Sequence, residues 1–263
     1  MRYVIAHGHI FKNAGTSFDS ALRGAFGEGF LDHRDDAAMR NGGAAHLREL
    51  LERNPTLKAI SSHHLCSPLP QESDICYLPV YFLRDPIERV VSVYNFERKQ
   101  PISTLGSKMA KEMNLIDYVR WRLEPGVPPT IRNFQTLYIG ETRQWKRGLE
   151  ANLDSLKIAM AVLKHKNTSF GLVEDFARGF NEIAAKLATY FPENSFEYET
   201  RNINSDLDSQ EKAEQAYRML APVMEELIEA NLFDIALYQY ARSKFFNSLP
   251  DENLNVNKVS ATN

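Results

Sequence analysis

A short segment near the start of the chain brings together residue types that bind phosphate. It reads Gly8-His9-Ile10-Phe11-Lys12-Asn13-Ala14-Gly15-Thr16-Ser17 and lies between a predicted strand and a predicted helix. The amino end of a helix carries unpaired N–H groups and a partial positive charge, and glycine lets the backbone approach an anion closely. We therefore predict a phosphate-binding loop over Lys12–Ser17.

The place of the lysine distinguishes this loop from that of the nucleotide triphosphatases. Their loop reads G-x-x-x-x-G-K-[ST], with the lysine directly after the second glycine. Here Thr16 holds that position, and Lys12 lies three residues before Gly15, so it would reach a bound phosphate from another side. The spacing argues against a kinase that uses ATP and Mg²⁺, which is kept as the first alternative.

A second anion site is predicted where another strand ends. Arg84 closes an apolar run, and the Asp85 and Pro86 that follow are typical of a helix start. The carboxyl ends of parallel strands are where α/β sheets bind ligands, and a guanidinium group suits phosphate oxygens. Ser92 lies off the apolar stripe of the predicted helix, so Arg84 and Ser92 are candidates to bind a second phosphate.

Two histidines follow the second predicted strand along the chain, in the run Ser61-Ser62-His63-His64. Side chains of adjacent strand residues point in opposite directions, so at most one of the two faces a substrate. Imidazole, with a pKa of about 6.5, can take the proton of a reacting hydroxyl group near neutral pH. We predict that His63 or His64 is a general base.

Both phosphate motifs resemble those of the PAPS-dependent carbohydrate sulfotransferases, Golgi-type and bacterial glycan O-sulfotransferases that include heparan sulfate 2-O-sulfotransferase. PAPS is 3′-phosphoadenosine 5′-phosphosulfate. Their first loop reads His-Ile-Pro-Lys-Thr-Ala-Gly-Thr-Ser, from which this chain differs at Phe11 and Asn13. Their second motif, Arg-Asp-Pro-x-x-Arg-x-x-Ser-x-Tyr, is matched by Arg84, Asp85, Pro86, Arg89, Ser92 and Tyr94. Further likenesses at Asn133-x-Gln135-Thr136 and Asn231-x-x-Asp234, which we interpret as helix packing and capping, extend the resemblance over most of the chain.

The resemblance implies a role for each of these residues. Lys12 would contact the sulfuryl and leaving oxygens, and the loop residues Asn13, Ala14, Gly15, Thr16 and Ser17 would bind the 5′-phosphate. Arg84 and Ser92 would bind the 3′-phosphate that distinguishes PAPS from ATP. Arg201, in the polar segment 200–205, either closes over the nucleotide or belongs to a plain surface loop. His63 is the first choice of base because it follows a small residue, as the family's histidine commonly does; His64 stays open.

His7 and His9 flank Gly8, and we expect both to order the loop. Together with His63 and His64 they could suggest a metal cluster, but no acid completes a recognised ligand spacing. The family that the chain resembles needs no metal for sulfuryl transfer. We therefore predict no metal, with PAPS as cosubstrate and adenosine 3′,5′-bisphosphate (PAP) as product.

The elements that must position these residues alternate between strand and helix. Apolar runs predict strands at the centre of a sheet near Tyr3–Phe11, Leu57–Ser62, Val80–Leu83 and Ser169–Leu172, and helices over Thr16–Phe26, from Asp85, and over Ala151–Lys164, Asp175–Tyr190 and Gln210–Phe246. Glycines and prolines between Gln100 and Asn133 predict a loop-rich insertion. The pattern favours an α/β fold, with three αβα layers around a central parallel sheet, like that of P-loop nucleotide hydrolases.

Length and composition fit one folded domain. The 263 residues are 43% apolar and 25% charged, and the net charge of -3 provides no general attraction to nucleic acid or acidic membranes. Cys66 and Cys76 match no zinc spacing, and no stretch approaches the roughly 18 apolar residues of a membrane span. We expect a cytoplasmic protein with one domain over residues 1–248 and a disordered tail over 249–263.

The predicted function is transfer of a sulfuryl group from PAPS to a hydroxyl group, with a saccharide acceptor favoured by the resemblance. The acceptor would attack sulfur in line while His63 or His64 takes its proton and Lys12 stabilises the leaving oxygen. The second alternative is a non-catalytic module that binds nucleotide or glycan. Such a module would need the two loops but not a histidine at a strand end.

Overall fold

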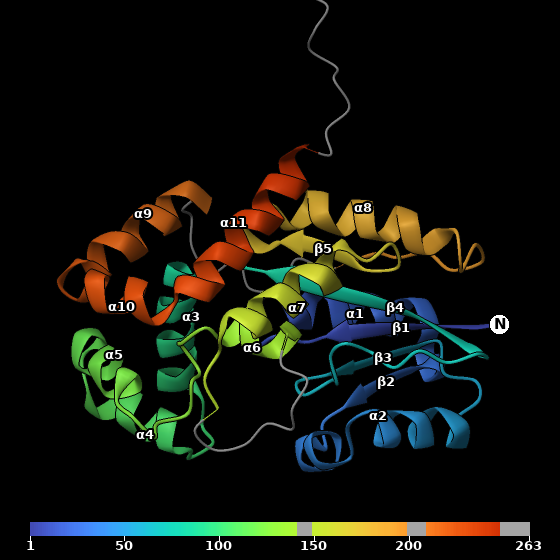
Figure 1. Cartoon of the computed structure of the whole chain (residues 1–263), viewed down its shortest axis with the longest axis horizontal. Coiled ribbons are helices and arrows are strands. Elements are labelled where there is room, and N and C mark those ends of the chain that lie inside the picture. The colour runs from blue at the N-terminus through green and yellow to red at the C-terminus, as the bar shows by residue number, and fades with distance from the viewer. Residues whose placement is uncertain (141–148, 199–208, 248–263) are drawn as a thin grey trace, which may run out of the picture.

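Five parallel strands form one sheet in the computed structural model, which describes residues 1–140, 149–198 and 209–247. The spatial order is β2-β3-β1-β4-β5, and all neighbouring pairs are parallel (Figure 1). The strands are β1 (Arg2–Gly8), β2 (Phe30–His33), β3 (Ala59–Ser62), β4 (Ile75–Leu83) and β5 (Ser169–Leu172). The order reverses beside β1, and in such sheets ligands bind outside the carboxyl ends of the strands at this point.

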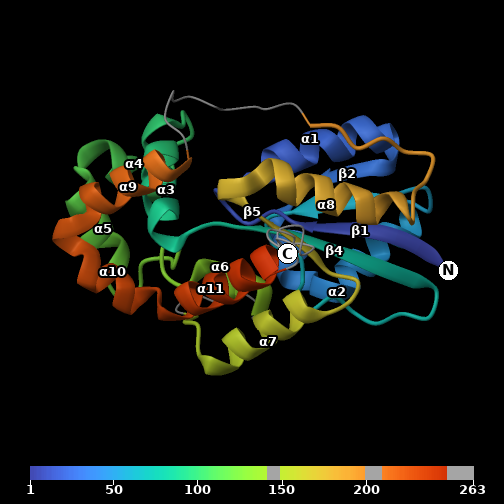
Figure 2. The same ribbon diagram turned by 90° about the horizontal axis from the view of Figure 1, so that it is seen from above.

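Helices cover both faces of the sheet, as a parallel sheet requires. One face is covered by α1 (Gly15–Phe26) and α8 (Phe176–Ala188). The other face is covered by α2 (Asp36–Arg53), α6 (Phe134–Gly140), α7 (Leu153–Lys164) and α11 (Leu232–Asn247). Figure 2 shows these two layers on either side of the strands, which confirms the predicted three-layer αβα architecture with a central parallel sheet.

The alternation of side chains along β1 builds two separate cores. Ile5 packs with the apolar faces of α1 and α8, whereas Val4 and Ala6 pack with α2 on the opposite side. All three side chains are fully buried. Burial of a side chain such as Val4 or Ile5 contributes about 1.5–3 kcal/mol to the stability of the fold. A register shift of one residue in this strand would move these side chains to the wrong face and would be strongly disfavoured.

A further group of helices lies beyond the carboxyl ends of the strands, at the left of Figures 1 and 2. It consists of α3 (Pro86–Lys99), α4 (Leu105–Glu112), α5 (Leu115–Leu123), α9 (Ser209–Leu220) and α10 (Met224–Ala230). These helices share an apolar cluster of their own, and a buried ion pair joins Glu97 of α3 to Arg122 of α5 at 2.5 Å. The group therefore forms a wall beside the end of the sheet where the predicted site lies.

The four predicted strands all form, but β5 lies at an edge rather than at the centre of the sheet. The predicted first strand ran to Phe11, whereas β1 ends at Gly8 and gives way to the loop. The stretch from Gln100 to Asn133 is not loop-rich as predicted, since it contains α4 and α5. The helical stretch predicted over Gln210–Phe246 is divided into α9, a short 3-10 turn, α10 and α11. The predicted tail lies outside the described residues.

Candidate cosubstrate and acceptor site

The predicted phosphate loop connects β1 to α1 through an unusual backbone path. Lys12 and Ala14 both have positive φ angles, 67° and 59°, and Ala14 is the residue that precedes the first turn of α1. Side chains cap the starts of α2, α3, α4, α5 and α7, whereas the starts of α1, α8 and α10 have no side-chain cap. No side chain therefore caps the amino end of α1, where the sequence predicts that an anion binds.

Gly15 is required by the packing of His9. A Cβ atom at position 15 would overlap the imidazole ring of His9, which lies against the first residue of α1. The histidine that precedes the loop thus lies directly beneath it, which fits the ordering role that we expected for His9.

The side chain of Asn13 is used inside the protein. It is almost fully buried, and its Nδ2 donates to the main-chain oxygen of Phe82 at 2.8 Å and to Oε1 of Gln135 at 2.6 Å. A threonine, the residue found here in the loop that this segment resembles, has one hydroxyl proton and could not donate both bonds. The departure at Asn13 thus has a structural reason, and its side chain ties the loop to the end of β4.

Lys12 is half-buried and lies against aromatic side chains. Its Nζ lies 4.6 Å from the centroid of the Phe96 ring, and Phe96 in turn packs edge-on against Phe11. Burial and the nearby charge of Arg84 lower the pKa of the Lys12 ammonium. Lys12, to which the resemblance assigns the leaving oxygen, is thus partly withdrawn from water, where its charge acts more strongly on an anion.

Arg84 brings the second predicted motif into contact with the first. Its Nη1 lies 3.5 Å from the main-chain oxygen of Lys12, and its Nη2 lies 3.5 Å from Oε2 of Glu88. Its Nε is buried and has no hydrogen-bond partner among the described residues. A buried guanidinium donor without a hydrogen-bond partner lowers the stability of the fold. An oxygen atom of a bound ligand could accept the missing hydrogen bond from Nε of Arg84.

Two other residues of the second motif differ in their surroundings. Ser92 is half-buried on α3, one turn after Arg89. Arg89 is fully buried and donates to the main-chain oxygens of Phe11 at 3.1 Å and Thr130 at 2.9 Å. Burial lowers the pKa of Arg89 to about 10. Arg89 therefore holds Phe11, the residue that precedes the phosphate loop, through a buried hydrogen bond.

His63 lies against His9 with its ring nitrogen engaged. Nδ1 of His63 lies 3.0 Å from the main-chain oxygen of His9, and the two ring centroids are 4.3 Å apart. A carbonyl oxygen only accepts, so Nδ1 of His63 carries the proton and Nε2 of the neutral ring keeps its lone pair. Burial and the neighbouring His9 lower the pKa of His63, which keeps the ring neutral and able to accept a proton.

His64 turns toward α2. Its Nε2 lies 3.8 Å from Oδ2 of Asp36, at the start of that helix, and burial lowers the pKa of His64 to about 4. The two histidines thus diverge, as adjacent residues at a strand end were expected to do. Of the pair, His63 is the one that contacts the segment leading into the phosphate loop.

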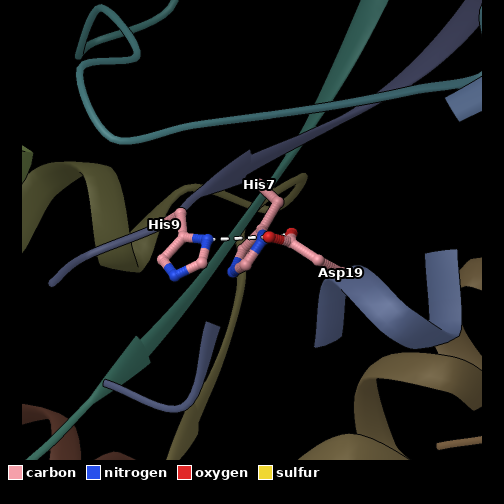
Figure 3. A group of neighbouring side chains, drawn as sticks. All are labelled: His7, His9 and Asp19. Atoms are coloured by element: carbon pink, nitrogen blue, oxygen red, sulfur yellow. Dashed lines mark hydrogen bonds and ion pairs between the residues drawn. The ribbon is translucent and has the colours of Figure 1, made fainter. Parts of the chain in front are cut away.

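His7, His9 and Asp19 form a buried cluster beneath the loop (Figure 3). Nδ1 of His7 lies 2.7 Å from Oδ1 of Asp19, and Nδ1 of His9 lies 2.7 Å from Oδ2. Burial alone would raise the pKa of the Asp19 carboxyl, but the two histidines outweigh burial and hold it well below its ordinary value. Arg34 donates to the same carboxylate at 3.0 Å.

The ligand atoms of this cluster all lie within 4.8 Å of one another, a separation that a metal ion could bridge. No acid stands at a recognised ligand spacing in the sequence, and Asp19 comes close to the two histidines only in the folded protein. Each histidine nitrogen that faces Asp19 is already at hydrogen-bonding distance from a carboxylate oxygen, and Arg34 adds a positive charge. These contacts describe an ionic hydrogen-bond network that holds His9 in place.

The segments around Asn133 and Asp234 cap each other's helices. Oδ1 of Asn133 accepts from the N–H groups of Phe233 and Asp234, and the carboxylate of Asp234 accepts from those of Gln135 and Thr136. The predicted capping role is therefore confirmed. Gln135 has an additional position between the two phosphate motifs that the sequence did not indicate, and Arg201 lies outside the described residues.

The parallel sheet with helices on both faces places the chain among the three-layer α/β proteins. Residues 1–241 match the model of the sulfotransferase family. The chain belongs to this family. An uncharacterized protein of Archaeoglobus fulgidus is 30% identical over 196 residues, which cover 73% of this chain and 76% of that protein.

Among solved structures, the chain is similar to mouse sulfotransferase SULT7A1 complexed with PAP, at 15% identity and a TM-score of 0.40. The match covers 85% of this chain, which spans 64% of the length of the mouse protein. Among the helices of the described residues, none has the length and apolar composition to cross a membrane.

Proposed function

We propose that the protein is a PAPS-dependent sulfotransferase that transfers a sulfuryl group to a hydroxyl group of a saccharide acceptor. The observation that carries the proposal is the contact between Lys12 and Arg84 at the carboxyl end of the sheet. It joins an uncapped helix start to a guanidinium group, and two such anion sites suit a nucleotide with two separate phosphate groups.

In this proposal the residues Lys12–Ser17 bind the 5′-phosphosulfate and the pair Arg84 and Ser92 binds the 3′-phosphate. The positive φ angles of Lys12 and Ala14 support the first assignment, because backbone turns that include left-handed residues are typical of anion-binding loops. The buried Nε of Arg84 supports the second, because a phosphate oxygen would give it an acceptor. Arg201 remains a candidate to close over the nucleotide.

The proposed transfer is a single in-line displacement. Nε2 of His63 takes the proton of the acceptor hydroxyl as its oxygen bonds to sulfur, and the bond from sulfur to the bridging oxygen breaks. The electron pair of that bond stays on the 5′-phosphate of PAP, where Lys12 stabilises the added charge. The protonated imidazole then returns its proton to solvent, which leaves the enzyme unchanged.

The remaining assignments rest on the sequence. A saccharide acceptor follows from the resemblance to carbohydrate sulfotransferases, and no metal is required for the step as written. The cytoplasm stays the expected compartment, where thiols such as the unpaired Cys66 and Cys76 persist.

The donor is tested by calorimetry with PAP and with ATP plus Mg²⁺. We expect PAP to bind at least about tenfold more tightly, because only PAP fills both phosphate sites. Equal or tighter binding of ATP would favour the kinase alternative.

The acceptor is tested by incubation with PAPS carrying labelled sulfur and a panel of saccharides, lipids and phenols. Absence of transfer to any of them, with PAP bound tightly, would favour the binding module.

A further inference from the structure

The side chain of Gln135 lies between the two phosphate motifs. Its Oε1 accepts from Nδ2 of Asn13 at 2.6 Å and from the main-chain N–H of Arg84 at 3.0 Å, and its Nε2 donates to the main-chain oxygen of Arg84 at 2.9 Å. Gln135 is completely buried. One amide group therefore bonds both the loop after β1 and the residue after β4.

The geometry of this contact resists deformation. Two of the three bonds are to the backbone of Arg84. They therefore fix the main chain at the start of the second motif as well as the side chain that it carries. The third bond reaches Asn13, whose amide also donates to Phe82 at the end of β4. Since buried polar groups must keep their partners, movement of either motif relative to the other would leave a buried donor or acceptor unpaired.

The position of Gln135 itself is fixed from the far end of the chain. Its main-chain N–H donates to Oδ2 of Asp234 at 3.0 Å, at the start of α11. Asp234 is buried as well. The amide that joins the motifs is thus held by an element that belongs to neither of them.

We propose that Gln135 sets the separation between the 5′-phosphate and 3′-phosphate sites, so that one nucleotide can occupy both at once. The proposal rests on the proposed function of these sites. A ligand that joins two anionic groups gains affinity only where both fit simultaneously, and this gain depends on the spacing of the sites rather than on their strength. Gln135 is a positioning residue in this scheme, since it would touch the motifs and not the nucleotide.

The test compares ligands with one and with two phosphate groups. Binding of PAP, adenosine 5′-monophosphate and adenosine 3′-monophosphate is measured by calorimetry on the full chain and on Gln135→Met. Methionine has a similar length but makes none of the three hydrogen bonds. We expect PAP to bind about tenfold or more weakly, while binding of each monophosphate changes by less than about twofold, because only PAP depends on the separation.

Asn13→Thr is a milder second variant, which keeps Gln135 and its bonds to Arg84 but removes the amide donor on the loop side. Threonine is the residue at this position in the loop that the segment resembles, so the contacts of the loop with a 5′-phosphate should be kept. We therefore expect a smaller loss of PAP affinity than in Gln135→Met, with binding of both monophosphates changed by less than about twofold. Ser107→Ala is the control. Ser107 is completely buried and caps α4 with its hydroxyl group, so its loss destabilises the fold without reaching either motif. We expect unchanged affinities for all three ligands.

The outcomes separate this inference from the proposed function. Equal weakening of PAP and of both monophosphates in Gln135→Met or Asn13→Thr would overturn the inference alone, since it indicates damage to the sites and not to their spacing. Unchanged PAP binding in both variants would overturn it too. If the unaltered protein does not prefer PAP to ATP with Mg²⁺, the proposed function and the inference fail together. If Gln135→Met does not fold, the same comparison of PAP with the two monophosphates in Asn13→Thr decides whether the inference holds.

Discussion

His63 donates a hydrogen bond from Nδ1 to the main-chain oxygen of His9, and the two rings are in contact. His9 is held in turn by Asp19 and lies beneath Gly15. The proposed base and the proposed phosphate loop are therefore parts of one packed unit. Neither can shift without the other, which is the arrangement that an in-line transfer between two bound substrates needs.

The assignment of the base predicts different results for the two adjacent histidines. His63→Ala should lower kcat by about 10²- to 10⁴-fold, the usual contribution of a general base. His64→Ala should lower it much less, because His64 points toward Asp36 of α2. The measurement is the rate of label transfer from PAPS, with PAP affinity as the check on folding. A larger loss in His64→Ala would reverse the assignment.

The pH dependence of catalysis should reflect the lowered pKa of His63. The neutral ring is the active form, and burial moves its pKa below the ordinary value of 6.5, so activity should persist at pH 6.5 and fall only at lower pH. The measurement is kcat/KM for PAPS as a function of pH. Activity that persists to about pH 4, where His64 titrates, would point to His64. An acid limb at or above 6.5 would contradict the buried environment.

Two glycines of α1 offer a matched pair of substitutions. Gly15→Ala places a Cβ atom in the ring of His9, and we expect a loss of about 1–3 kcal/mol in the free energy of unfolding together with weaker PAP binding. Gly24→Ala meets no atom within 4 Å, and we expect a gain of about 0.4–1 kcal/mol with PAP binding unchanged. Thermal unfolding and calorimetry check both. Similar effects at the two positions would contradict the contact with His9.

Arg84 should distinguish nucleotides by their 3′-phosphate. Arg84→Met removes a charged donor, and we expect PAP to bind about 10- to 100-fold more weakly, in line with about 1.5–3 kcal/mol for a charged hydrogen bond. Binding of adenosine 5′-monophosphate should change little, because it has no 3′-phosphate. Calorimetry with both ligands provides the measurement. Equal losses for the two nucleotides would place Arg84 at the 5′ site or in the support of the loop.

The sheet could be predicted from sequence where its strands are apolar runs, as in β1, β4 and β5. β2 escaped prediction because Phe30–His33 has only two apolar residues, Phe30 and Leu31, followed by the polar Asp32 and His33. The helix α4 was not predicted because it contains Gly106, and a glycine at this place in the sequence favours a loop. In the structure Gly106 lies against the buried pair of Glu97 and Arg122, where no side chain would fit. That reason belongs to tertiary packing and has no local signal.

The candidate site shows the same division. Lys12, Gly15 and Arg84 could be predicted as candidate site residues because each lies in a short motif of neighbouring residues. Asp19 lies within the predicted helix Thr16–Phe26 and has no local signal of its role, since its bonds to His7 and His9 exist only once α1 packs along β1. The sequence indicates only packing or capping for Gln135, because its partners are 122 and 51 positions away in the chain. Contacts of that range cannot be deduced from the periodicity of one segment.

The bond between Gln135 and Asp234 has a consequence for the order in which the protein is made. The phosphate loop leaves the ribosome before Gln135 of α6, whose amide bonds to it. Asp234, which caps α6, is translated 99 residues after Gln135. A nascent chain would thus hold every residue of the first motif without a finished site until α11 has emerged. Loss of α11 through a premature stop codon should therefore abolish nucleotide binding at the loop between β1 and α1.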